Sequence, residues 1–310
     1  MNGLVFRLLQ EIKYFGKNKE LFFLSLPGVI FIFIFCYIPM AGLVIAFKDF
    51  RYDLGFWRSK WVGFDNFKFF LTSDTFLRVT RNTVAFNLLF IFGTLAVSVV
   101  FALILNELSS RHVKIYQTIM FFPYFLSWVV VGYIFMALLD MDKGFFNTVL
   151  KGFGIEPIFW YNEPGYWPVL LMFANIWKGA GYFAIIYYTA LIGINQEYYE
   201  AAELDGASKL QQIRNISIPL ILPLVIIMLL LSIGKIFNAD FGMFFQLTKD
   251  SAALYPTTDV IDTYVYRALT KTADISMASA AGFYQSLVGF IMVLISNALV
   301  KKLSSENSLF

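Results

Sequence analysis

The stretch that decides the fold is EYYEAAELDGASKLQQIRNISIPLILP, residues 197–223, a polar segment in a chain that is otherwise rich in apolar residues. The 310-residue chain is 59% hydrophobic and only 15% charged, whereas soluble domains carry about 45–50% apolar and about 25% charged residues. This excess of apolar residues indicates an integral membrane protein. The question is why such a protein keeps a compact, charged segment between two apolar runs.

Six apolar runs are long enough to cross the hydrocarbon core of a bilayer, which takes about 20 residues of helix. Helix is the expected form, because lipid offers the backbone no hydrogen-bond partners. We therefore predict an all-α membrane protein with six transmembrane helices in residues 21–310, preceded by an N-terminal segment, residues 1–20. The first run is too long for a signal peptide and is expected to be retained. The predicted spans are residues 21–47, 83–105, 115–139, 167–192, 218–236 and 278–300.

Within the polar segment, residues 196–204 predict a short helix with Asn195 as its N-cap. Gly206 follows at a position suited to a sharp turn or a helix C-cap. A second helix is expected over residues 208–216, with Asp205 as its candidate cap. Pro219 suits the first turn of the fifth span, because proline is tolerated there and disrupts a helix interior. The predicted order is therefore helix, turn, helix and then span.

The spacing of these residues resembles a family signature. Glu200, Ala201 and Ala202, followed by Gly206 and residues 216–219, resemble the E-A-A-x3-G-x9-I-x-L-P motif of ABC importer permease subunits, with Ile218 in place of the usual leucine. LDGA at residues 204–207 is typical of sugar importers. The chain is also similar to maltose-type permeases, most of all to the branch that imports oligosaccharides or polysaccharide fragments, in YIPMAGLVIAFKDF (37–50), WVGFDNFKFF (61–70), RNTVAFNLL (81–89), FFPYFLSWVVVGYIF (121–135) and DVIDTYVYR (259–267).

The resemblance implies a type I importer permease fold, in which residues 193–219 form a cytoplasmic coupling loop between spans four and five. It also implies a bacterial cell membrane location with both termini inside. The positive-inside rule does not decide the orientation, because the basic segment FKDFRYDLGFWRSK (47–60) lies in an expected outer loop.

The partners implied by the resemblance are ABC ATPase subunits, a second homologous permease, an extracytoplasmic solute-binding protein and an oligosaccharide substrate. The chain has no G-x-x-x-x-G-K-[ST] motif, so we expect ATP and Mg to be bound by the partner ATPase and no cofactor in this chain. The lipid bilayer surrounds the spans, and a net charge of +3 is too small to imply nucleic acid binding.

The coupling loop would transmit the motion of the ATPase, because a short capped helix joined to a span moves as a rigid body and a flexible loop does not. Its alanines leave a low surface for close docking. Glu200 would pair with a basic group of the ATPase or, alternatively, only stabilise the start of its own helix. The expected coupling residues are Glu200, Ala201, Ala202, Asp205, Gly206, Ala207 and Pro219.

Polar residues inside spans are costly and usually face the bundle interior or a water-filled path. FANIWKGAGYF (173–183) resembles the segment of a maltose-transporter permease that contributes an asparagine and a glycine to the sugar site, although Lys178 replaces a usually apolar residue. In SIGKIFNADFGMFF (232–245), Asp240 aligns loosely with another sugar-contacting asparagine. The predicted substrate-path residues are Asn175, Trp177, Lys178, Gly179, Asn238 and Asp240.

Other interpretations of these residues stay open. Lys178 and Asp240 could form an ion pair between helices, which would neutralise both charges. Lys178 and Lys235 could instead attract an acidic sugar such as a uronate. Trp177 could be a packing or interfacial residue.

Two other classes of function also fit a six-span protein. One is a secondary carrier for a small polar solute, driven by an ion gradient, and the other is a membrane scaffold or sensor. A carrier would work without an ATPase, and a scaffold would show no substrate-stimulated ATP hydrolysis in any complex. An enzyme is not expected, because one cysteine (Cys36) and one histidine (His112) make a metal site or a Cys–His pair improbable.

Overall fold

The computed structural model describes residues 19–303, so the expected N-terminal segment of residues 1–20 lies almost entirely outside the described residues. The regular secondary structure of the described residues is helical apart from a two-stranded antiparallel ribbon, β1 (Lys48–Asp49) with β2 (Lys60–Trp61), in which Lys48 lies opposite Trp61. Within residues 19–303, five helices are long and apolar enough to cross a membrane, and a bent pair of helices makes a possible sixth span.

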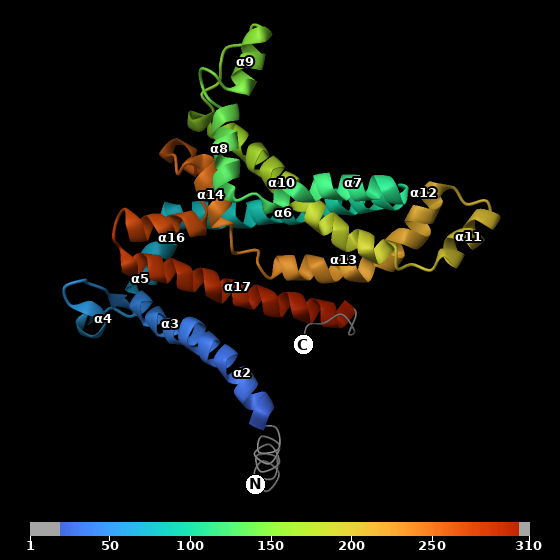
Figure 1. Ribbon diagram of the computed structural model, residues 1–310. Helices are drawn as coiled ribbons and strands as arrows, with labels where there is room; N and C mark the ends of the chain where they lie inside the picture. Colours follow the sequence, from blue (N-terminus) through green and yellow to red (C-terminus); the bar gives the residue numbers. More distant parts are fainter. Residues whose placement is uncertain (1–18, 304–310) are drawn as a thin grey trace.

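The long helices run side by side and form the bundle in Figure 1. They are α6 (Asp74–Asn106), α10 (Trp167–Leu191), α13 (Ile218–Ile233) and α17 (Ile275–Leu303). Helix α6 begins before the expected residue 83, because the Ser73 side chain accepts a hydrogen bond from the Phe76 amide and caps it in front of the apolar stretch. The centre of the bundle is the pair α6 and α10, which share the main apolar core.

The first span lies at the edge of the molecule. It runs through α2 (Lys19–Ile32), η1 (Phe33–Tyr37), α3 (Ile38–Met40) and η2 (Ala41–Phe47), which together cover the expected residues 21–47. No residue of α2 is buried in the chain, and α2 diverges from α17 in Figure 1. Its apolar side chains therefore face lipid or another subunit.

The third predicted span, residues 115–139, is not one continuous helix. The segment forms α7 (Ser110–Phe121), η3 (Phe122–Phe125) and α8 (Trp128–Leu138), with a bend of 95° between the two α-helices. Pro123 lies in the break, where its missing N–H cannot continue the ladder of an α-helix. The Ser127 side chain then accepts from the Val130 amide and starts α8 in its new direction.

Helix α8 packs against α14 (Phe241–Thr248), and both lie at the end of the bundle away from the polar segment. The contact requires a glycine, since a Cβ on Gly132 would lie 2.8 Å from the Gln246 carbonyl oxygen. The same end carries the short helices α4 (Gly55–Arg58), α5 (Asp65–Leu71), α9 (Phe145–Gly152), η4 (Trp160–Asn162), η5 (Pro164–Tyr166), η7 (Ala252–Leu254), α15 (Tyr255–Thr258) and α16 (Ile261–Thr270).

At the opposite end, the polar segment forms α11 (Gln196–Leu204) and α12 (Lys209–Gln212), which project beyond the bundle in Figure 1. Asn195 caps α11 as expected, and Gly206 takes the left-handed conformation with a φ of 78°. The expectation that Asp205 caps the second helix is wrong. Asp205 ends α11, and Ser208 caps α12 in a capping box with Gln211, because its hydroxyl reaches the Gln211 amide.

The second helix also continues into the fifth span instead of ending before it. Helix α12 passes through a single π-helical turn, η6 (Ile213–Ser217), into α13, so that residues Lys209–Ile233 form one helical run. The wider turn accommodates Pro219, because the Ile218 amide bonds to the Ile213 carbonyl five residues earlier. The polar segment is therefore joined to the membrane helix without a loop.

Candidate functional site

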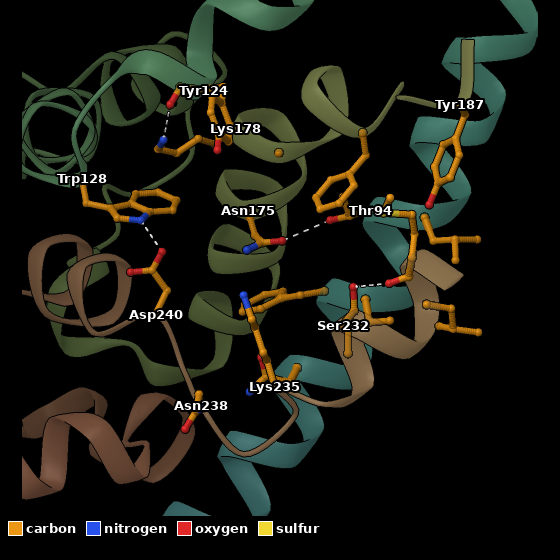
Figure 2. Close-up of a pocket in the computed structure, with 18 residues that line it drawn as sticks. Thr94, Tyr124, Trp128, Asn175, Lys178, Tyr187, Ser232, Lys235, Asn238 and Asp240 are labelled. Carbon is orange, nitrogen blue, oxygen red and sulfur yellow. Dashed lines mark hydrogen bonds between the residues drawn. The ribbon is translucent and has the colours of Figure 1, made fainter. Parts of the chain in front are cut away.

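A cavity of about 490 Å³ opens between α6, α10, the break in the third span and the C-terminal end of α13. Five of the six predicted substrate-path residues line it, namely Asn175, Lys178, Gly179, Asn238 and Asp240. Trp177 does not line the cavity, and its side chain is 37% exposed on the surface of the chain. Segments that are well separated in the sequence thus meet around one polar space, as Figure 2 shows.

Helices α6 and α10 supply several neutral polar groups to the cavity. The Thr94 hydroxyl donates to the Asn175 side-chain oxygen at 3.2 Å and holds the amide in the cavity wall. Asn87 lies seven residues before Thr94 on α6 and lines the same cavity. Positions separated by seven residues share one helix face, so this pair of polar residues in an apolar span was a usable sequence signal that the prediction missed.

Lys178 is held by the break in the third span. Its ammonium donates to the Tyr124 carbonyl oxygen at 2.7 Å and lies 5.3 Å from the ring centroids of both Tyr124 and Trp128. The break frees this carbonyl from helical hydrogen bonding, and the ring faces add cation–π attraction. Tyr124 and Trp128 are therefore cavity residues that the sequence analysis missed, because it did not foresee the break in the third span.

Asp240 is held on the other side of Trp128. The Trp128 indole N–H donates to one carboxylate oxygen of Asp240 at 2.5 Å, and the other oxygen accepts from the Met243 amide at 3.1 Å as the N-cap of α14. The alternative of an ion pair between Lys178 and Asp240 is not found, because no such pair lies within 4.0 Å in the part of the chain described. Instead the indole of Trp128 stands between the two charges (Figure 2).

The turn after α13 brings a second ammonium into the cavity. Lys235 points from this turn toward Asn175 in Figure 2, and within residues 19–303 its ammonium group has no hydrogen-bond or ion-pair partner. The charged residues of the cavity wall are thus Lys178, Lys235 and Asp240, two cations and one anion. Such a cavity combines amide and hydroxyl groups with aromatic faces and a positive balance, which suits a polar ligand that carries negative charge.

The predicted coupling residues lie on α11 and on the turn that follows it, except Pro219, which lies in the first turn of α13. Glu200, Ala201, Asp205 and Gly206 are exposed, Ala202 and Ala207 are half-buried, and Pro219 is exposed further along. The most exposed apolar side chain here is Leu204, which is 91% exposed at the end of α11. An apolar side chain so fully exposed at a projecting tip favours contact with another protein.

Helix α11 is attached firmly to the helix that leads into the membrane. The Tyr199 hydroxyl and the Ser217 hydroxyl are 2.9 Å apart and join α11 to the π-helical turn. Glu203 pairs with Lys209 at 3.3 Å across the turn at Gly206, and the Ala207 amide bonds back to the Ala202 carbonyl. These contacts link α11 to the turn at Gly206 and to the π-helical turn that leads into α13.

Comparison with known proteins yields consistent matches over most of the chain. A family model described as "Binding-protein-dependent transport system inner membrane component" matches residues 98–305. Protein LplB of Bacillus subtilis (strain 168) is 33% identical over 94% of this chain and 91% of its own length. The polygalacturonan/rhamnogalacturonan transport system permease protein YteP of the same organism is 36% identical over 94% of this chain and 90% of its own length.

The fold also matches solved structures. A chain in a crystal structure of a bacterial ABC transporter involved in the import of the acidic polysaccharide alginate superposes with a TM-score of 0.87 and 31% identity. The match covers 95% of this chain and 99% of that chain. A second match has a TM-score of 0.85 and comes from the bacterial alginate transporter in complex with an alginate pentasaccharide-bound periplasmic protein.

Proposed function

The chain belongs to the family of inner membrane components of binding-protein-dependent transport systems, and from this premise we propose that it is a permease subunit of an ATP-driven oligosaccharide importer. It would form the translocation path together with a second homologous permease and receive the oligosaccharide from a solute-binding protein. ATP and Mg would be bound by separate ATPase subunits. The observation that carries the proposal is the polar cavity at one end of the helical run Lys209–Ile233, whose other end is joined through the turn at Gly206 to the projecting helix α11.

The cavity has the chemistry that a sugar requires. Hydroxyl groups of a sugar need both donors and acceptors, which Asn87, Asn175 and Asn238 provide on three sides. The apolar C–H face of a sugar ring packs on aromatic rings, and Tyr124 and Trp128 offer such rings. A volume of about 490 Å³ has room for a short part of an oligosaccharide, so a longer chain would pass through in sequence.

The two lysines favour an oligosaccharide that carries carboxylates. Lys178 and Lys235 outnumber Asp240, and the carboxylate of Asp240 is already engaged by the Trp128 indole and the Met243 amide. The relative YteP and the alginate transporter are both named for acidic polysaccharides. We therefore assign a uronate-containing oligosaccharide to the cavity, with the ammonium groups of Lys178 and Lys235 as its charge partners.

The projecting α11 would dock on the ATPase, which requires that residues 193–219 and both chain termini lie on the cytoplasmic side. Leu204 would anchor the contact in an apolar pocket of the ATPase, and the small side chains of Ala201 and Ala202 would allow close approach. Because α11 is tied to Ser217 and residues 209–233 are one helical run, a displacement of α11 would move the cavity end of α13.

The substrate assignment is tested in proteoliposomes that contain the complete transporter and its binding protein. The measured quantity is ATP hydrolysis stimulated by a uronate oligosaccharide and by a neutral oligosaccharide of equal length. In Lys235→Gln and Lys178→Gln we expect the half-saturating concentration of the loaded binding protein to rise about tenfold for the acidic ligand, the equivalent of about 1.4 kcal/mol. Lys60→Gln, an exposed lysine outside the cavity, is the matched control. Equal loss for acidic and neutral ligands would overturn the charge assignment.

The coupling assignment is tested separately with Leu204→Ser and with Glu200→Lys. Both variants are expected to weaken co-purification of the ATPase and to abolish uptake, while the isolated permease pair stays folded. Arg111→Gln, an exposed change at the start of α7 at the same end of the bundle, should leave both properties intact. Uptake by this chain without any ATPase, driven by an ion gradient, would support the secondary carrier instead.

A further inference from the structure

The cavity wall contributed by residues 235–240 is not part of any helix. Helix α13 ends at Ile233, and the chain makes a tight turn before α14 begins at Phe241. The turn is held locally by bonds from the Lys235 amide to the Ser232 carbonyl and from the Asn238 amide to the Lys235 carbonyl. These short-range bonds leave the Phe237 carbonyl and the Ala239 amide to find partners elsewhere.

Both groups are satisfied by one pair of side chains from outside the cavity. The Asp262 carboxylate accepts from the Ala239 amide at 2.9 Å, and the same oxygen accepts from the Gln285 side-chain amide at 3.0 Å. The Gln285 amide also donates to the Phe237 carbonyl at 2.7 Å. Asp262 and Gln285 thus close a ring of hydrogen bonds around the turn, and neither side chain lines the cavity.

The start of helix α16, which carries Asp262, is bonded to α6. Asp262 lies in the first turn of α16, where the Ile261 amide donates to the Thr83 hydroxyl at 3.0 Å. The side-chain amide of Asn82 donates to the backbone carbonyl of Asp259 at 3.0 Å. The Asp259 carboxylate, fully buried, pairs with Arg267 and with Arg78. The position of Asp262 is therefore set by the same helix that presents Thr94 to the cavity.

Gln285 provides the second fixed point. It lies on α17, is 8% exposed, and joins the turn to this helix. Burial raises the pKa of the Asp262 carboxyl against the lowering effect of the hydrogen bonds from Ala239 and Gln285. Burial of a carboxylate costs desolvation free energy, and hydrogen bonds to the Ala239 amide and the Gln285 side chain offset part of that cost.

We propose that Asp262 and Gln285 are positioning residues for the substrate cavity, acting as a clamp that fixes the turn and with it the side chains of Lys235, Asn238 and Asp240. The clamp ties α16 and α17 to the end of the fifth span. Its role in ligand recognition rests on the proposed function, whereas its effect on the turn does not. A movement of α16 or α17 relative to α6 would change the shape of the cavity through this ring.

The first experiment measures the turn without any substrate. Cys36 is replaced by serine, Asn238→Cys supplies a single thiol in the cavity wall, and the rate of maleimide labelling is measured in the assembled transporter. Adding Asp262→Asn or Gln285→Leu is expected to change the labelling rate at least threefold, because the turn leaves its fixed conformation. Asp274→Asn is the control, since its carboxylate also accepts a backbone amide, that of Met277, without touching the turn. An unchanged rate in both clamp variants overturns the proposal.

The second experiment separates positioning from general stability. In Asp262→Asn, Gln285→Leu and the double variant, we expect the half-saturating concentration of loaded binding protein to rise about five- to tenfold, with basal ATP hydrolysis unchanged. Because both residues act through one ring of hydrogen bonds, the half-saturating concentration of the double variant should be no higher than that of the more strongly affected single variant. Additive losses, or a lowered melting temperature with unchanged half-saturation, overturn the clamp. If labelling changes but no oligosaccharide stimulates hydrolysis even in the unmodified transporter, the clamp stands and the proposed substrate is wrong.

Discussion

Gly179 and Gly181 lie on the same helix, α10, and differ in what surrounds them. A Cβ on Gly181 would lie 1.8 Å from the Met120 carbonyl oxygen of α7, whereas a Cβ on Gly179 would meet only a Thr94 methyl group at 3.7 Å. Contacts below 3.0 Å are essentially never observed for a real Cβ atom. In Gly181→Ala, α7 must therefore retreat from α10 by about 1 Å, because close-packed interiors offer no slack.

The magnitude follows from comparing the two alanine variants. Replacing glycine by alanine within a helix contributes about 0.8–1.0 kcal/mol in its favour at either position, so this gain cancels in the difference. What remains is the overpacking cost at Gly181, about 1–3 kcal/mol. At about 2–4 °C for each kcal/mol, the conversion for domains of about 150–250 residues, Gly181→Ala should melt roughly 2–12 °C below Gly179→Ala.

The displacement also has a consequence for transport. Met120 lies four residues before Tyr124, whose carbonyl accepts the Lys178 ammonium at 2.7 Å. A retreat of about 1 Å takes this contact beyond the range of a hydrogen bond. Gly181→Ala is therefore expected to reduce uptake of the acidic oligosaccharide even at a temperature where the complex remains folded.

The assay is the fraction of assembled complex that survives brief heating, measured by size-exclusion chromatography at a single heating rate, because membrane complexes unfold irreversibly. Uptake is measured on the same preparations well below the melting temperature. If Gly181→Ala and Gly179→Ala melt within 1 °C of one another, the close contact between α7 and α10 is not a feature of the folded protein.

Three further predictions concern single side chains. Asn147→Ala should destabilise the loop around α9 by about 1–3 kcal/mol and speed its proteolysis, because the fully buried Asn147 side-chain amide bonds to the backbone of both Asp140 and Ile158. The control variant is Lys151→Ala, an exposed change on the same helix. Cleavage of Asn147→Ala no faster than that of the control would refute this prediction. Ser208→Ala should cost about 0.5–2 kcal/mol of α12 stability, seen as faster amide exchange in residues 209–212, and unchanged exchange would contradict the capping box. Burial raises the pKa of the Asp262 carboxyl above its value in the unfolded chain, so between these two pKa values the folded state binds more protons than the unfolded state. The wild type should therefore lose stability relative to Asp262→Asn as the pH rises through that window. A difference in melting temperature between the two proteins that is constant from pH 3.5 to 7 would exclude the shift.

The family and the fold class were predictable because their signals are local in the sequence. Long apolar runs predict membrane spans, because a helix satisfies its own backbone hydrogen bonds where lipid offers none. The fixed spacing from Glu200 to Pro219 indicated the family that the comparisons confirm. The break in the third span was not predicted, although Pro123 lies in it, since residues 115–139 are apolar enough throughout to read as one helix. Hydropathy reports the total length of an apolar run and says nothing about its direction.

The cavity was only partly predictable. Asn175 and Gly179 came from the resemblance, and Asp240 from a loose alignment, whereas the alternative of an ion pair between Lys178 and Asp240 is not found. Two charges in one cavity can be counted from a sequence, whereas their partners depend on a third segment, here Trp128, which the break in the third span brings between them. Asp262 could not be assigned for the same reason, because its partners lie on the turn after α13 and on α17.

The continuous helical run of residues 209–233 gives the two candidate sites a mechanical relation. Twenty-five residues of helix extend about 37 Å, so a tilt of about 5° at the α11 end displaces the far end by about 3 Å. That displacement equals the length of a hydrogen bond, and it would be delivered to the turn that carries Lys235. The clamp of Asp262 and Gln285 holds the other side of this turn against α16 and α17. A tilt of α13 must therefore either strain the ring of hydrogen bonds or move those helices with it, and in both cases the hold of the cavity on a carboxylate changes with the position of α11.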